Sequence, residues 1–267
     1  MRNTLTARLL WWAGIVFFFG FLLAPLAILV AVSFNPVAMV FPPEGFSLKW
    51  YAVILEKTDF LHSAWASLKL GAMTATLSTG MGLLAAIGLQ QYDGRFKGLI
   101  SSLLMSPLFI PAVILALALF QVQFMLGVSN NMWVLLAAHV VVTIPYPVRN
   151  VMAQLAGFDG RLEEAALTVG ATPREAMRRV TLPLLKASII PSFIITFILS
   201  WNNYTVSVFL ANKDWTTLPL QLRAYLQYEY EPFVAAMSTV LIVASIILLI
   251  IVDRMVGLST KEAKARN

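Results

Sequence analysis

Long apolar runs separated by short polar stretches organise this chain of 267 residues. Five of the runs are long enough for the roughly 20 helical residues that cross a bilayer, and a sixth is about that long. The runs cover residues 9–32, 63–89, 99–126, 132–152, 187–211 and 233–256. The first follows Arg2 and Arg8, as in a secretory signal, but it exceeds the roughly 7–15 apolar residues of a signal. The pattern predicts an all-α, polytopic membrane protein with six transmembrane helices in a single domain, residues 1–267.

Composition and charge support this prediction and set an orientation. Hydrophobic residues make up 59% of the chain and charged residues 12%, about half the charged share of an ordinary soluble domain. Lys and Arg accumulate in short cytoplasmic loops. With both termini in the cytoplasm, the basic residues outside are Lys49, Lys57, Lys213 and Arg223, and most of the others are inside. This bias accounts for the net charge of +6 without a nucleic-acid partner.

Residues 164–183 form a polar island between the fourth and fifth apolar runs, on the cytoplasmic side in this orientation. Ala165 and Ala166 favour helix, and Gly170 can adopt the left-handed conformation that ends one. The small side chains before the turn allow another backbone to approach closely. From composition alone, an ordinary amphipathic surface loop remains an equal alternative.

A second helix is predicted directly after this turn. Thr172 and Glu175 have the spacing of a capping box, and Pro173 stands between them at the first helical position. Pro183 is expected to end the helix. The side chains that this helix carries are Arg174, Met177, Arg178, Arg179 and Val180.

Several chemistries lack the residues that they require. The chain contains no Gly-x-x-x-x-Gly-Lys-[Ser/Thr] phosphate loop, so it does not bind ATP through a loop of this kind. Any process that it drives across the membrane must take its energy from a separate subunit or an ion gradient. All Asp and Glu residues lie in loops, in tails or at the ends of apolar runs, which argues against a proton-coupled carrier. Cysteine is absent, and with it disulfides and thiolate metal sites. His62 and His139 have no acidic or nucleophilic partner at a recognisable spacing, and His139 is expected to hydrogen-bond between helices.

Prolines should bend or break two of the apolar helices. Pro107 and Pro111 lie in the third run, and Pro145 and Pro147 lie in the fourth. These helices therefore either border a pathway through the membrane or have kinks that improve packing. Lys69, about two turns into the second run, is expected to extend its ammonium group to the outer interface.

The fifth run carries the densest polar cluster among the apolar segments. Its members are Ser200, Trp201, Asn202, Asn203, Tyr204, Thr205 and Ser207. Unpaired amides are costly in hydrocarbon, so these groups should face other helices or water. Trp201, Asn202, Asn203, Tyr204 and Ser207 are therefore candidates for the substrate pathway. Packing against a partner subunit is the alternative.

The polar island resembles the EAA motif of ABC-importer permeases, which reads Glu-Ala-Ala, three residues, Gly, nine residues, Ile, one residue, Leu-Pro. The corresponding residues here are Glu164, Ala165, Ala166, Gly170, Val180, Leu182 and Pro183. The one departure is Val180, where Ile is usual. The resemblance implies a cytoplasmic coupling loop of about residues 153–186 that docks into a groove of an ATPase, with Arg174 and Met177 among the coupling residues.

Beyond this motif, most of the chain resembles the second permease subunit of spermidine/putrescine-type importers. The matching stretches are residues 33–35, 45–51, 105–107, 157–159 and 218–220. Polyamine permeases tend to carry acidic residues where this chain has Asn202 and Asn203. The sequence is therefore equally consistent with a polyamine and with a less cationic solute, such as an amino acid derivative, an opine or an aminophosphonate.

The resemblance implies the type I ABC importer permease fold in a bacterial inner membrane. It also implies a homologous second permease, two copies of a P-loop ATPase and an extracytoplasmic substrate-binding protein. ATP and magnesium would bind to the ATPase, and this chain would hold no cofactor and catalyse no reaction of its own. Transport would follow from alternating access. A secondary carrier or channel without an ATPase is the alternative.

Overall fold

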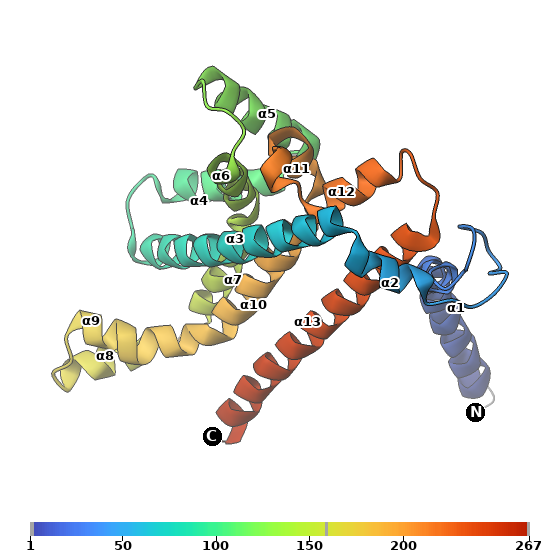
Figure 1. Cartoon of the computed structure of the whole chain (residues 1–267). Helices are drawn as coiled ribbons and strands as arrows, with labels where there is room; N and C mark the ends of the chain where they lie inside the picture. Colours follow the sequence, from blue (N-terminus) through green and yellow to red (C-terminus); the bar gives the residue numbers. More distant parts are fainter. Residues whose placement is uncertain (1–2, 158–159, 266–267) are drawn as a thin grey trace. The chain divides into compact units, whose positions relative to one another are not determined.

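The computed structural model describes residues 3–157 and 160–265, without the side chains of residues 3–6, 248–249, 251–253 and 255–265. Helices and loops make up all of this described part, so the all-α prediction is confirmed (Figure 1). The helices are α1 (Asn3–Val32), α2 (Lys49–Glu56), α3 (Thr58–Gln91), α4 (Lys97–Met105), η1 (Ser106–Leu108), α5 (Ala112–Met125), α6 (Met132–Thr143), α7 (Pro145–Ala156), α8 (Arg161–Thr168), α9 (Pro173–Ala176), η2 (Met177–Thr181), α10 (Leu182–Trp201), α11 (Tyr204–Leu210), η3 (Lys213–Trp215), α12 (Leu218–Tyr225) and α13 (Pro232–Ala265).

Within the described residues, four helical stretches are long and apolar enough to cross a membrane. They are Ala7–Val32, Thr58–Gln91, Met132–Ala156 and Pro173–Trp201. The third predicted span consists of two helices, Lys97–Leu108 and Ala112–Met125, which are bent by 108° at the break between them. The sixth corresponds to α13, whose described apolar part, Pro232–Ile247, is shorter than a full span.

The prolines act on these helices to different degrees. Pro111 stands just before α5 with an extended ψ of 131°, and the third span bends sharply there, as predicted. Pro145 begins α7 after an interruption at Ile144, yet residues 132–156 continue as one span. A proline at the first helical position removes a donor that has no partner there, which explains the milder effect.

The chain divides into two compact units. One comprises Met1–Leu61 and Leu222–Ile246. Its aromatic centre is formed by the rings of Phe60, Tyr225 and Phe233, with Phe60 and Phe233 centroids 4.8 Å apart. Lys57 Nζ donates to Tyr225 Oη at 2.8 Å, and Tyr225 Oη donates to Glu231 at 2.6 Å. Burial, followed by the hydrogen bond to Glu231, raises the pKa of Tyr225.

The second unit, His62–Gln221 with Ile247–Asn267, contains both candidate sites. In it α10 packs along α7, and α11 packs against α5 and α6. Leu70, Leu135 and Leu210 are buried together at the centre of this packing. Gly82 of α3 lies so close to α7 that a Cβ atom there would stand 2.8 Å from the ring of Pro147. The close approach of these two helices therefore requires glycine at this position.

Candidate functional site

The EAA-like segment begins with a helix that ends in a Schellman motif. Gly170 has a φ of +93°, as predicted for a left-handed helix end. Its N–H donates to the carbonyl of Leu167 at 3.0 Å, and the N–H of Ala171 donates to the carbonyl of Ala166 at 3.1 Å. A Cβ atom at Gly170 would meet nothing within 4 Å. Glycine is therefore needed here for its backbone conformation and not for space.

The capping box predicted at the start of the next helix is also present. Thr172 Oγ1 accepts from the N–H of Glu175 at 3.3 Å, while Glu175 Oε2 accepts from the N–H of Thr172 at 3.0 Å. Pro173 occupies the first helical position. The bond from the Thr172 N–H is the main cause that lowers the pKa of the Glu175 carboxyl, whose side chain is 47% exposed.

The predicted end of this helix at Pro183 is wrong. The chain passes from α9 through the π-helical turn η2 directly into α10, so that Pro173–Trp201 is one helix of 29 residues. Pro183 has no N–H for an α-helical bond, and the π-turn just before it changes the hydrogen-bond register. The buried face shifts accordingly, because Ala176 and Thr181 are both buried although five positions apart. The segment is therefore joined to the fifth span without a flexible link.

A contact that the sequence motif did not indicate ties α8 to this helix. Glu163 Oε2 accepts from Thr181 Oγ1 at 3.1 Å, and Thr181 is buried. Both residues line a cavity of about 230 Å³ with Gln90 and Gln91 of α3. In the sequence, Glu163 is recognisable only as an acidic residue in the first turn of a helix, where the helix dipole stabilises a negative charge. This signal does not identify Thr181 as its partner.

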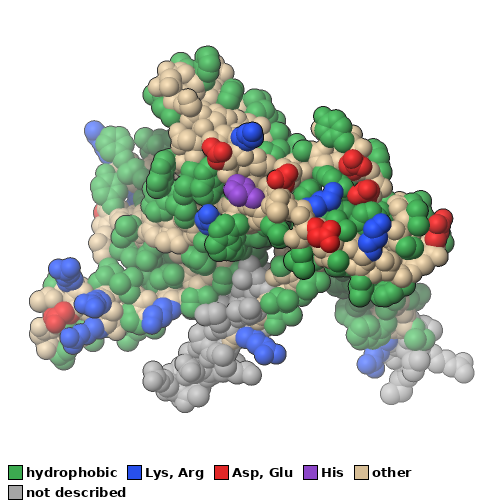
Figure 2. Space-filling view, viewed as in Figure 1, with side chains coloured by type: hydrophobic (Ala, Val, Ile, Leu, Met, Phe, Trp, Pro, Cys, Tyr) green, Lys and Arg blue, Asp and Glu red, His purple; other side chains and the backbone are tan. Residues whose placement is uncertain are grey.

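The predicted coupling residues lie on the surface of this segment. Those that are exposed are Glu164, Ala165, Gly170, Arg174 and Pro183, and those that are half-buried are Ala166, Met177, Val180 and Leu182. The apolar side chain of Val169 at the turn is 86% exposed. Basic side chains gather over α8, α9 and the start of α10 (Figure 2). Because Val169 has no cover in the described chain, this surface is suited to a docking partner.

The sequence predicts one helix through the polar cluster, but the structure has a break there. α10 ends at Trp201, Asn202 and Asn203 form a break, and α11 begins at Tyr204. Asn203 Oδ1 accepts from the N–H of Val206 at 3.0 Å and so caps α11. Asn202 is exposed, and its side-chain amide donates to the carbonyl of Ile198 at 3.0 Å. Asparagine competes with the helical backbone for hydrogen bonds, which explains why the helix stops here.

The other predicted pathway residues differ in exposure. Trp201 is half-buried, with its ring stacked on that of Phe197 at 5.7 Å, and Tyr204 is 37% exposed. Ser207 is buried and donates to the carbonyl of Asn203 at 2.7 Å. The groups with surface to offer a solute are therefore Asn202 and Tyr204, with Trp201 and Asn203 beside them.

Lys69 is exposed on α3, between two indole rings. Its Nζ atom lies 5.5 Å from the ring centroid of Trp65 and 5.6 Å from that of Trp215. The faces of these rings attract the ammonium group. This placement explains how a lysine is accommodated in an apolar segment.

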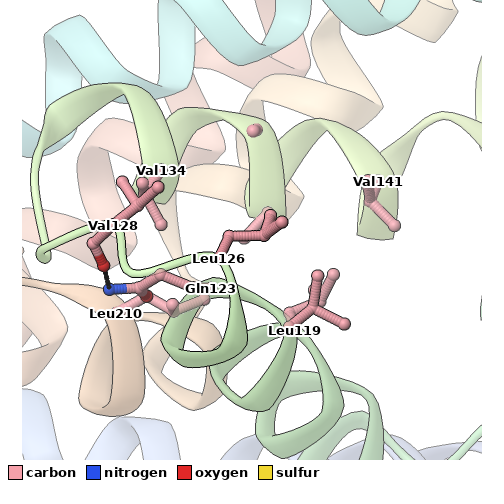
Figure 3. Close-up of a pocket in the computed structure, with 10 residues that line it drawn as sticks. Leu119, Gln123, Leu126, Val128, Val134, Val141 and Leu210 are labelled. Atoms are coloured by element: carbon pink, nitrogen blue, oxygen red, sulfur yellow. Dashed lines mark hydrogen bonds between the residues drawn. The ribbon is translucent and has the colours of Figure 1, made fainter.

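An apolar cavity lies between α5 and α6 (Figure 3). Its volume is about 200 Å³, and the side chains of Leu119, Val134 and Val141 form much of its lining. Gln123 contributes its amide, which donates to the carbonyl of Val128 at 2.9 Å. None of the predicted pathway residues lines this cavity. The cavity is consequently separate from the polar cluster.

The family of the chain follows from its sequence. A profile of the family described as "Binding-protein-dependent transport system inner membrane component" matches residues 78–264. This match covers more than half of the chain, which therefore belongs to that family. It is an inner-membrane permease subunit of a binding-protein-dependent ABC importer, as the motif predicted, and the secondary-carrier alternative is set aside.

Individual relatives and a solved structure agree with this assignment. The chain is 31% identical over 232 residues to the spermidine/putrescine transport system permease protein PotC of Escherichia coli K12, covering 87% of this chain and 88% of PotC. It is 28% identical over 246 residues to a putative 2-aminoethylphosphonate transport system permease protein, PhnV, of Salmonella paratyphi A, covering 90% and 91%. A bacterial ABC transporter involved in alginate import has the same fold, with a TM-score of 0.76, 17% identity and coverage of 95% and 98%.

Proposed function

We propose that this permease carries a small polar or cationic solute with an amino group into the cell by ATP-driven alternating access. Polyamines, amino acid derivatives, opines and aminophosphonates all fit this description. Two relatives support it, since PotC is named for spermidine and putrescine and PhnV for 2-aminoethylphosphonate. The polar cluster at residues 201–207 is consistent with such a solute, because uncharged amides and aromatic rings bind amines without a buried carboxylate.

The same proposal includes the partners that transport requires. They are a homologous second permease, two copies of a cytoplasmic P-loop ATPase that binds ATP and magnesium, an extracytoplasmic substrate-binding protein and the surrounding lipid. Large exposed apolar side chains support the presence of lipid and protein neighbours. The clearest case is α1, where only 6% of the most apolar stretch of 18 residues is buried within the chain. We place both termini in the cytoplasm on the distribution of basic residues, and we treat residues 1–267 as one transmembrane domain.

The observation that carries the coupling proposal is the direct continuation of the EAA-like segment into α10. Closure of the ATPase dimer would displace the exposed turn at Gly170, and the capping box keeps the following helix intact at its start. The displacement would pass along one helix as far as Trp201. There it reaches the break at Asn202 and Asn203, beside the candidate solute contacts. Outward opening of the spans would then admit solute from the binding protein.

Uptake by the reconstituted complex tests this proposal. The subunits encoded with this chain would be placed in proteoliposomes with ATP inside and the binding protein outside. Labelled putrescine and 2-aminoethylphosphonate would serve as probes. We expect uptake of at least one probe that requires both ATP and the binding protein. Uptake that persists without ATP would contradict the mechanism. An assembled complex that hydrolyses ATP but imports neither probe would exclude these two solutes and leave amino acid derivatives and opines as the next probes.

A further inference from the structure

The break between α10 and α11 is bridged by one imidazole ring. His139 of α6 is fully buried, and its Nδ1 atom lies 2.8 Å from Ser200 Oγ, just before the break. Its Nε2 atom lies 3.5 Å from Ser207 Oγ, just after the break. Ser200 and Ser207 are buried as well. One side chain thus holds both sides of the interruption in the helix that leads from the coupling segment.

The neighbouring hydrogen bonds favour one tautomer of this ring. Ser207 donates its hydroxyl proton to the carbonyl of Asn203 at 2.7 Å, so towards His139 it acts as an acceptor. Both ring nitrogens are paired only when Nε2 carries the imidazole proton. Nδ1 is then the acceptor for the hydroxyl of Ser200. The resulting chain of donors runs from Ser200 through His139 and Ser207 to the backbone at the break.

A second buried polar pair ties α6, the helix that carries His139, to α3. Thr143 Oγ1 donates to the carbonyl of His139 at 2.7 Å and lies 2.8 Å from Ser78 Oγ of α3. Ser78 and Thr143 are fully buried. Buried polar networks with complete pairing make an arrangement of helices specific, because each partner left alone would be costly. The ring of His139 therefore joins α10 and α11 to α6, and the pair of Thr143 and Ser78 joins α6 to α3.

We propose that His139 is a positioning residue that fixes the geometry of the break, so that α10 and α11 move together with α6 during transport. It contacts no solute and catalyses no reaction. Without this bridge, only the local caps and the packing of α11 would hold the break, and less of the displacement of α10 would pass Asn202 and Asn203. The transmission part of this inference rests on the coupling role proposed above, whereas the fixed geometry of the break does not.

Distances between spin labels test the fixed geometry. The chain has no cysteine, so single cysteines at Ile195 of α10 and Val208 of α11, which are 39% and 41% exposed, can be labelled selectively. We expect a narrow distance distribution in the parent complex and a broader one in His139→Ala. His139→Gln, whose amide can still donate to Ser207, should restore part of the narrow distribution. Thr196→Val is the matched control, because the buried hydroxyl of Thr196 has no hydrogen-bond partner within the described structure.

Uptake per ATP hydrolysed tests the transmission. In assembled complexes this ratio should fall about fivefold in His139→Ala, the equivalent of one lost hydrogen bond, and should stay at the parent value in Thr196→Val. If His139→Ala does not assemble, Ser207→Ala supplies the same two measurements. An unchanged distance distribution would overturn the fixed geometry, and an unchanged ratio beside a broadened distribution would overturn the transmission. Failure of the Gly170 region as a coupling element would leave the distance result intact.

Discussion

The EAA-like segment and the helix break are both turns between helices, but different forces hold them. At Gly170 and Thr172 the hydrogen bonds connect residues within five positions of one another, and most of the side chains are exposed. At Asn202 and Asn203 local caps are present too, but the bridge comes from His139, more than sixty positions away. The turn at Gly170 and Thr172 can therefore move and still keep the shape that it presents to a partner. The second keeps its shape only while α6, which carries His139, stays packed against it.

Substitutions at Gly82 and Gly170 separate the effect of packing from that of local backbone conformation. The Gly82 substitution is expected to have the largest effect on the abundance of folded protein. Gly82 has a neighbour in its way, because a Cβ atom would lie 2.8 Å from Pro147 and 3.1 Å from the backbone N of Val148. We expect Gly82→Val to lower the abundance of folded protein severely, since overpacking a closely packed site costs about 1–3 kcal/mol or more. Membrane abundance and thermal aggregation in detergent measure this. Gly80→Val is the control, because a Cβ atom there meets nothing within 4 Å, and equal loss in both variants would contradict the packing argument.

A substitution at Gly170 should impair uptake and leave the abundance of folded protein nearly unchanged, the reverse of the effect at Gly82. Gly170→Val leaves room for the side chain, but a β-branched residue resists a φ of +93° by about 1–2 kcal/mol. We expect near-normal abundance with a large loss of ATP-dependent uptake, either because ATP hydrolysis is uncoupled or because the ATPase detaches. Gly170→Asn, which tolerates the left-handed conformation better, should retain more activity. Normal uptake in the valine variant would remove the reason to regard this turn as the coupling element.

The turn and the capping box of the EAA-like segment were predicted from the sequence because their signals are local. Gly170, Thr172 and Glu175 fix their own backbone through neighbours in the chain. The sequence did not indicate the continuation past Pro183, because a π-turn depends on how the helix packs and has no residue signature of its own. It also missed the break at Asn202 and the contact between Glu163 and Thr181.

Residues such as Asn202 and His139 are ambiguous in a sequence because hydrocarbon makes every polar group seek a partner. The chain shows that a partner is needed but not which residue supplies it. For His139 an interhelical hydrogen bond was expected, and Ser200 and Ser207 provide it. The number of spans illustrates the same limit, since apolar runs count segments but do not indicate that the third one turns by 108°.

Asn203 offers a moderate effect that separates capping from solute contact. Asn203→Leu removes the cap of α11 and any bond to solute, and we expect uptake to fall by the equivalent of about 1–3 kcal/mol. Asn203→Asp keeps an acceptor for the N–H of Val206 and adds a negative charge. It should raise the uptake of putrescine relative to the native solute. Unaltered selectivity in both variants at equal complex abundance would assign the cluster to packing.

Thr172→Ala should give the smallest effect. It removes the side-chain half of the capping box, which contributes about 1 kcal/mol at the start of a helix, while the Schellman turn at Gly170 remains. We expect a modest drop in uptake per ATP, and Thr172→Ser should behave as the parent. Since the box lowers the pKa of Glu175, its contribution is present above the ordinary Glu pKa and is lost as the pH falls through the lowered value. A drop in the serine variant as large as in the alanine variant would contradict the cap.

Photo-crosslinking tests the central claim, that residues 164–183 are the surface that meets the ATPase. A photoreactive phenylalanine would replace Val169 at the exposed turn in one variant and Val208 on α11 in another, in the assembled transporter. We predict that Val169 yields an adduct with the ATPase, that Gly170→Val weakens this adduct, and that Val208 yields none. An ATPase adduct from position 208 but not from position 169 would contradict the account.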